Sequence, residues 1–524
     1  MESVEQIKNR QRGEKMNKKI LYIPLDERPC NYRNIIKIME IEKEIELIYP
    51  DESVLSQKKK KADVEKIWKF VEKEITECQY AVIASEMLCY GGLLPSRIHD
   101  GKNSIEKILK KIMKLKEINP KCKIFISSLI MRTPQYSSSE QEPDYYEEYG
   151  RDIFRYGVLK DKEERMMLTE IEKEELKKIK GYLPKEYIED FENRRQYNRS
   201  FILGLLELVK NDYIDTMVIP QDDSYEYGYT AIDQKIVYKA IQKYRISNKV
   251  LTYSGADETG YTLVARCINE IYNRVPKIYA FYSTIAGEMV IPKYEDRAIG
   301  ENLKSHILAV GGRLVEREDE ADIILAYNTP PLSGMLEANQ QFEDNIDYDR
   351  NRNLAYFVNE ISYHIKCGKS VSICDCAYAN GGDFRLLTML KDSLENLYSL
   401  KSYHAWNTNC NTLGSSLAES CIFLNKEHSI EMEGILLESV FEDIFYEGVI
   451  RNILIKEYLP KYPNISYFNI SNEETMICDI AEEKVKELYK YVFKKEWSEN
   501  IRNMTISFPW SRLFNADFKI EIGG

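Results

Sequence analysis

Residues 217–228 read Met-Val-Ile-Pro-Gln-Asp-Asp-Ser-Tyr-Glu-Tyr-Gly, a short apolar run that stops at two adjacent carboxylates, Asp222 and Asp223. A helical pattern follows the glycine. An apolar run of this length is typical of a buried parallel strand. In α/β proteins, ligands bind at the carboxyl ends of such strands. The stretch therefore predicts a strand, a turn that carries paired acids, and a helix.

The same order of apolar strand, polar strand end and helix recurs along the chain. Strands are predicted at 19–27, 79–87, 123–131, 249–254, 370–377 and 400–406. The polar residues that follow them are Asp26 with Glu27 and Arg28, Glu86, Arg132, Asp257 with Glu258, Asp375 with Asp383, and Trp406 with Asn407. Capping alone does not predict acid pairs at several strand ends, so the recurrence indicates an enzyme.

The predicted fold class is α/β. With residues 275–331 set aside, about eight β–α units remain, the number in a (β/α)8 barrel. We expect a (β/α)8-barrel-like main domain with an inserted small α/β unit and a mostly helical C-terminal extension. The alternative is a doubly wound sheet with a second α/β domain. The expected parts are a disordered polar segment at 1–18, six β–α units at 19–274 with a surface excursion or lid at 135–198, the insert at 275–331, the last units at 332–424, and the extension at 425–524.

Composition excludes several classes of protein. The net charge is −12 over 524 residues, which argues against nucleic acid as a partner. No apolar run is long enough to span a bilayer, and the polar start lacks the apolar core of a secretory signal. The 11 cysteines follow no disulfide framework, which is typical of reduced thiols. We therefore expect a cytoplasmic protein with no membrane partner.

Several motifs together resemble a bacterial family of unknown function, the DUF4127 proteins. The matching motifs are Pro24-Leu-Asp-Glu-Arg-Pro29, Tyr90-Gly-Gly-Leu-Leu-Pro-Ser-Arg97, Gln221-Asp-Asp223 with Tyr227-Gly228, Gly255-Ala-Asp-Glu258, Ala377-Tyr-Ala-Asn-Gly-Gly-Asp383, and Trp406-Asn-Thr408 with Asn411-Thr-Leu-Gly414. They run from about residue 20 to the C-terminal Pro509-Trp510 segment. The resemblance implies no catalytic assignment, so the roles below come from the residues.

Acid pairs beside amide and aromatic side chains suit a sugar-like small molecule, because amides bind hydroxyl groups and a flat ring covers an apolar face. Glycoside hydrolysis needs one carboxyl group as acid and one as base, nucleophile or stabiliser. Asp222 and Asp223 are the first candidates for these roles, and Asp257 and Glu258 are the reserve pair. Arg28 and Arg132 suit a carboxylate or phosphate on the substrate. The predicted substrate-binding residues are Asp26, Arg28, Glu86, Arg132, Tyr227, Asp375, Asn380, Asp383, Trp406, Asn407 and Asn411.

Structural interpretations of the same residues stay open. A carboxylate just after a strand is often the N-cap of the next helix or one half of an ion pair. Glu27 and Arg28 suit a local ion pair, and Trp406 suits core packing.

Two other functions also stay open, a Mg²⁺- or Mn²⁺-dependent hydrolase or lyase and a non-catalytic sugar-binding protein. The five histidines have no zinc-site spacing, and the chain has no phosphate-binding loop and no G-x-S-x-G motif. No cofactor and no bound metal are expected.

Overall fold

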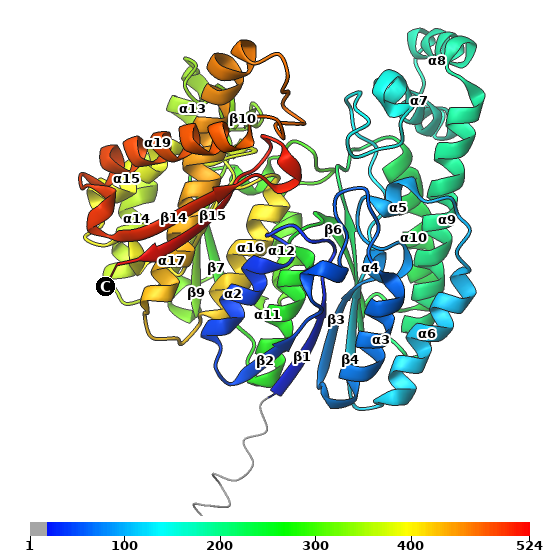
Figure 1. Ribbon diagram of the computed structural model, residues 1–524, viewed down its shortest axis with the longest axis horizontal. Helices are drawn as coiled ribbons and strands as arrows, with labels where there is room; N and C mark the ends of the chain where they lie inside the picture. The colour runs from blue at the N-terminus through cyan, green and yellow to red at the C-terminus, as the bar shows by residue number, and fades with distance from the viewer. Residues whose placement is uncertain (1–17, 524) are drawn as a thin grey trace, which may run out of the picture.

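The computed structural model describes residues 18–523, and its first six strands form one parallel sheet (Figure 1). The strand order is β2-β1-β3-β4-β5-β6, with every neighbouring pair parallel. The strands are β1 (Lys18–Ile23), β2 (Ile45–Ile48), β3 (Tyr80–Ala84), β4 (Lys123–Ser127), β5 (Thr216–Gln221) and β6 (Val250–Ser254). The expected disordered segment 1–18 lies outside the described residues, except for Lys18, which begins β1.

A second parallel sheet follows in the chain. Its order is β13-β11-β9-β7-β8. The strands are β7 (Lys277–Tyr282), β8 (Arg313–Leu314), β9 (Ile323–Asn328), β11 (Ser370–Asp375) and β13 (Ser402–His404). In both sheets the second strand lies outside the first and the later strands add on the other side, which is the flavodoxin-like doubly wound order. The α/β class is therefore confirmed, and the same topology occurs twice.

A closed eight-stranded barrel is not shown by the described strands. β2, β6, β8 and β13 are all sheet edges, and no pairing joins the two sheets. The segment 275–331, expected to be an insert, instead supplies β7, β8 and β9, and β11 and β13 complete the sheet around them. The pattern of β–α units could not distinguish these folds, because it shows where strands lie but not which strands pair. The two-sheet alternative describes the observed strand order.

Helices cover both sheets. Those of the first part are α2 (Arg33–Ile41), α3 (Val64–Glu74), α4 (Ser85–Cys89), α5 (Pro95–Ile98), α6 (Ile105–Ile118), α10 (Tyr229–Tyr244) and α11 (Thr259–Ile271). Those of the second part are α12 (Ile299–Ala309), α13 (Ile346–Asn351), α14 (Leu354–Lys366), α15 (Phe384–Ser393) and α16 (Asn409–Ile422).

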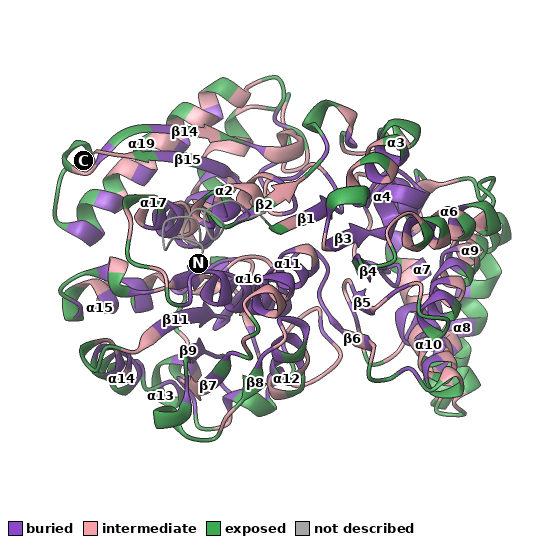
Figure 2. Ribbon diagram, turned by 90° about the horizontal axis from the view of Figure 1, so that it is seen from below, coloured by how far each residue is buried: buried purple, intermediate pink, exposed green. Residues whose placement is uncertain are grey.

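One apolar core joins the two sheets. α11 packs directly against α16, and all fourteen residues of α16 are buried (Figure 2). The same cluster of buried side chains includes Phe125 of β4, Leu263 of α11, Leu417 of α16 and Leu325 of β9. Apolar burial of this extent stabilises one arrangement of the sheets.

Segment 135–198 extends away from the first sheet as helices with a core of their own (Figure 1). They are α7 (Tyr146–Glu164), α8 (Glu170–Tyr182) and the first half of α9 (Lys185–Lys210). The C-terminal part contains α17 (Ile430–Ser439), the π-helical η7 (Val440–Ile450), α18 (Arg451–Ile453), α19 (Glu474–Phe493), and the antiparallel pair β14 (Ile501–Ser507) and β15 (Asp517–Ile522).

The loop between β14 and β15 reaches the first sheet. There the indole N–H of Trp510 donates a hydrogen bond to Glu27 Oε1 at 2.7 Å. Glu27 therefore supports the C-terminal loop, while Arg28 pairs with other acids, so the expected Glu27–Arg28 ion pair is not formed.

None of the helices between residues 18 and 523 combines the length and the apolar character needed to cross a lipid bilayer. All eleven cysteines are free thiols.

Candidate functional site

A cavity of about 300 Å³ lies where the carboxyl ends of the two sheets meet. The first sheet contributes residues that follow β1, β4, β5 and β6, and the second contributes residues that follow β11 and β13. Those predicted from the sequence that line it are Arg28, Arg132, Asp222, Asp223, Asp257, Asn380 and Asn407. Residues as far apart in the chain as Arg28 and Asn407 are thus brought together by the docking of two doubly wound sheets.

Asp222 and Asp223 form one wall of the cavity, in the turn after β5. Asp223 has a φ of +43°, so the turn directs two successive carboxylates to different partners. Arg97 Nη2 lies 2.6 Å from Asp222 Oδ2, and Arg132 Nη1 lies 3.1 Å from Asp223 Oδ2. Burial, with the neighbouring Asp222 charge second, raises the pKa of Asp223 to about 6. Asp223 can therefore hold or release a proton near neutral pH.

Glu142 lies behind this wall, bonded to its arginines, and the sequence did not suggest it. It is fully buried and accepts hydrogen bonds from Arg97 Nη1 at 3.3 Å and Arg132 Nε at 2.8 Å. It belongs to the 135–198 excursion, where no strand end marks it. Arg97 is on α5, just after Gly91 and Gly92, and nothing in its spacing distinguished it from a capping or surface arginine.

Arg28 anchors the opposite wall through two carboxylates. Its guanidinium donates to Asp26 at 2.9 and 2.7 Å and to Asp257 at 3.1 and 2.5 Å. Burial alone would raise the pKa of Asp257, but Arg28 outweighs burial and holds the pKa below its usual range. Asn411 adds a contact, since its Oδ1 accepts the Asp257 backbone N–H at 3.2 Å. Asp26 and Asn411 therefore position Arg28 and Asp257 without lining the cavity.

Glu258 and Glu86 lie behind the cavity wall. Glu258 is buried, accepts the Ala256 backbone N–H at 2.9 Å, and lies 3.2 Å from Nε2 of His306. Glu86 accepts the Leu129 backbone N–H at 2.7 Å, and burial raises its pKa to about 7. Neither carboxyl group lines the cavity between the sheets, so the structure does not bring Asp257 and Glu258 to it together.

Asp375, Asp383 and Tyr227 also lie away from the cavity. Asp383 is the N-cap of α15, accepting two backbone N–H groups, and pairs with Arg352 at 2.6 Å. Asp375 accepts the Asp383 backbone N–H at 2.9 Å, and burial raises its pKa to about 7. Tyr227 lies beside Lys162 in the last turn of α7 and Arg165 just after it. The capping interpretation therefore describes Asp383.

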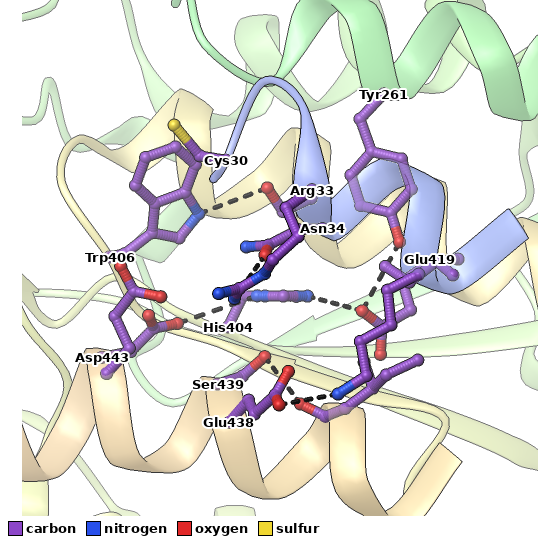
Figure 3. Close-up of a pocket in the computed structure, with 15 residues that line it drawn as sticks. Cys30, Arg33, Asn34, Tyr261, His404, Trp406, Glu419, Glu438, Ser439 and Asp443 are labelled. Atoms are coloured by element: carbon purple, nitrogen blue, oxygen red, sulfur yellow. Dashed lines mark hydrogen bonds and ion pairs between the residues drawn. The ribbon is translucent and has the colours of Figure 1, made fainter. Parts of the chain in front are cut away.

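Trp406 lines a different and smaller cavity of about 50 Å³ (Figure 3). Its indole N–H donates to Ser415 Oγ at 3.2 Å. Beside it, His404 lies between Glu419 at 2.9 Å and Asp443 at 3.7 Å. Burial disfavours the charged imidazole, but the two acids prevail and raise the pKa of His404 to about 10. Trp406 is thus packed near a charged cluster and is not the aromatic platform of the larger cavity.

Other aromatic residues line the larger cavity instead. They come from loops whose approach to the strand ends left no local signal in the sequence. These residues are Tyr136, Tyr294, Tyr467, Phe468 and Phe514. Within residues 18–523, no three His, Cys, Asp or Glu side chains come together as ligands of a metal ion would.

The fold and the cavity define an α/β protein with a ligand-sized cavity between two doubly wound sheets. Over residues 20–519 the chain matches the family described as "Protein of unknown function (DUF4127)", and it belongs to that family. The resemblance drawn from the motifs is confirmed. No curated protein matches the chain significantly.

Proposed function

We propose that this protein is an enzyme that hydrolyses a glycosidic bond of a small saccharide or glycoconjugate in the interdomain cavity. One observation carries the proposal: adjacent carboxyl groups, Asp222 and Asp223, line a cavity of about 300 Å³, and the pKa of Asp223 is raised to about 6. A cavity of this size is at the lower end of the range for small-molecule sites. A general acid is most effective when its pKa lies near the working pH.

The remaining lining suits a hydroxylated ligand. Asn380 and Asn407 supply amide groups from the second sheet, and tyrosine and phenylalanine rings supply flat apolar faces. Both asparagines have a positive φ, 59° and 51°, so each holds a backbone conformation that most residues avoid. Such positions are often found in functional sites.

In the proposed reaction, Asp223 gives its proton to the oxygen of the leaving group as the glycosidic C–O bond breaks. The Asp222 carboxylate, held by Arg97, stabilises the positive charge that develops on the sugar. Water then adds to the anomeric carbon and returns a proton to Asp223. The balance is one water consumed and two hydroxyl-bearing products released.

The test is sugar release by the purified full-length protein from a panel of aryl glycosides and natural disaccharides. Asp223→Asn should abolish turnover, because an amide cannot donate the proton. The matched control is Asp212→Asn, which changes an exposed aspartate paired with Lys249. The absence of turnover by the folded wild-type protein on every substrate would contradict the proposal. If Asp223→Asn turned over the substrate as fast as the wild type, Asp223 would not be the general acid.

A further inference from the structure

Arg512 lines the interdomain cavity but does not follow a strand of either parallel sheet. It stands in the loop between β14 and β15, lines the cavity, and is 4% exposed. The loop brings it there from the C-terminal part of the chain, and Trp510 fastens the loop to Glu27.

Arg512 differs from the other arginines of the cavity in having no acidic partner. The others are each held by two carboxylates: Arg28 by Asp26 and Asp257, Arg97 by Glu142 and Asp222, and Arg132 by Glu142 and Asp223. Among residues 18–523, no carboxylate lies within ion-pair distance of Arg512, and its buried Nε has no hydrogen-bond partner. Its guanidinium carbon lies 4.5 Å from the centroid of the Trp510 ring and 4.9 Å from that of Phe514.

A buried charge without a partner is costly to fold. Burial, followed by repulsion from Arg28, lowers the pKa of Arg512 to about 10, which still leaves the guanidinium charged near neutral pH. Contacts with two aromatic faces offset part of the cost, but they leave the N–H donors unused. The arrangement is that of a cation whose partner comes from outside the chain.

We propose that Arg512 binds an anionic oxygen group, a carboxylate or a phosphate, of the ligand, so that the substrate is an acidic sugar or a sugar phosphate. The identification of the ligand as a sugar rests on the proposed function, whereas the anion site itself rests on Arg512 alone. The guanidinium offers paired N–H donors that match either group. The two aromatic rings hold its plane, which reduces the entropy lost on binding.

The test is calorimetric binding to the full-length protein, with glucuronate, glucose 6-phosphate, inorganic phosphate and neutral glucose as probes. At least one anion should bind more tightly than glucose. Tighter binding of glucuronate identifies the anionic group as a carboxylate, and tighter binding of glucose 6-phosphate identifies it as a phosphate. Arg512→Met should weaken that binding about tenfold to a hundredfold, the effect of losing charged hydrogen bonds. Arg317→Met, which removes an exposed arginine paired with Asp319, should leave it unchanged.

Thermal unfolding separates ligand binding from a structural role. Without ligand, Arg512→Met should unfold at the same temperature as the wild type or higher, because it removes an unpaired buried charge and keeps an apolar stem between the rings. Arg512→Lys should keep part of the anion binding. A lowered unfolding temperature together with unchanged anion affinity would overturn the inference, as would the failure of every anion to bind the wild type at millimolar concentration.

The outcomes also separate this inference from the proposed function. If Arg512→Met loses anion binding and the wild type releases no sugar, the result supports the anion site and counts against glycoside hydrolysis. Turnover of neutral glycosides that is unaffected by Arg512→Met overturns the anion site and leaves hydrolysis standing.

Discussion

Replacement of Arg28 by methionine tests whether the acids of the cavity are held by arginine pairing. The Arg28 guanidinium makes four hydrogen bonds to two carboxylates, Asp26 and Asp257, which are 1% and 5% exposed. Arg28→Met keeps much of the side-chain volume but leaves two buried carboxylates facing each other. Removing one partner of a buried ion pair costs about 3–5 kcal/mol, so we expect the free energy of unfolding at pH 7 to fall by about that amount.

The loss should depend on pH in a defined direction. In the wild type, Arg28 holds the pKa of Asp257 below its usual range, so this carboxylate stabilises the fold above the unfolded pKa of about 3.9 and loses that contribution as the pH falls through the folded pKa. In Arg28→Met, burial raises the pKa of both Asp26 and Asp257. The carboxyl groups then take up protons as the pH falls, so the deficit should be largest at neutral pH and shrink towards pH 5.

Urea unfolding of both proteins at several pH values measures this deficit. Arg317→Met, at an exposed ion pair, is the control and should not change the unfolding midpoint measurably. Adding Asp257→Asn to Arg28→Met should restore part of the stability, because it removes one of the uncompensated charges. A deficit below about 1 kcal/mol, or one that is constant between pH 7 and pH 5, would refute the assignment of Arg28 as the residue that neutralises these acids.

Three further predictions concern single positions. If Asp223 is the acid, kcat/KM for sugar release should fall about tenfold per pH unit above pH 6, and a profile that rises there would contradict the assignment. Gly255→Ala should lower the free energy of unfolding by about 2 kcal/mol or more, since φ is +133° and a Cβ would lie 2.3 Å from Glu258 Oε1; Gly181→Ala, with open space around it, is the control in thermal unfolding. Because the pKa of Glu86 is raised to about 7, Glu86 should make the wild type less stable as the pH rises from 4.5 to 7, and Glu86→Gln should reduce this loss by an amount on the order of 3 kcal/mol in urea titrations.

The strands and their polar ends could be predicted from the sequence because both are local features. An apolar run that stops at charged residues identifies a parallel strand and the direction in which it runs, and β5 occupies Thr216–Gln221 as residues 217–221 predicted. From the direction of parallel strands it also follows that their carboxyl ends share an edge. This reasoning applies to Asp222, Asp223 and Asp257, which follow strands of one sheet, whereas Asn380 and Asn407 reach the same cavity from the second sheet.

The partition into two sheets could not be predicted in the same way. Strand pairing depends on contacts between residues distant in sequence, and a β–α unit looks the same in a barrel and in an open sheet. The two sheets have the same strand order, but the sequence shows no matching internal repeat. The capping role of Asp383 and the packing of Trp406 were equally open, because a polar strand end suits a cap, a core contact or a ligand contact alike.

Two of the residues missed altogether stand in loops, Glu142 behind the cavity wall and Arg512 in its lining, whereas the missed Arg97 is on α5. Glu142 arrives from the helical excursion and Arg512 from the turn of the C-terminal hairpin. Neither follows an apolar run, so no periodic pattern marks them. Long loops that carry function are identified only when the fold shows what they approach.

The docking of the two sheets determines what kind of site this is. A ligand site between domains often forms only when the domains close, and relative motion is expected when their interface is small. Here α11 and α16 pack together inside a core that runs from Phe125 of one sheet to Leu325 of the other. Such a core resists separation of the walls, so the arginines and acids are held in place before a ligand arrives. The loop carrying Arg512 is also held in place, because Leu513 is buried in the core of the second part and its backbone bonds to Tyr446 and Tyr467. Capture of an anion by Arg512 would therefore take place in a cavity whose walls and C-terminal loop are already formed.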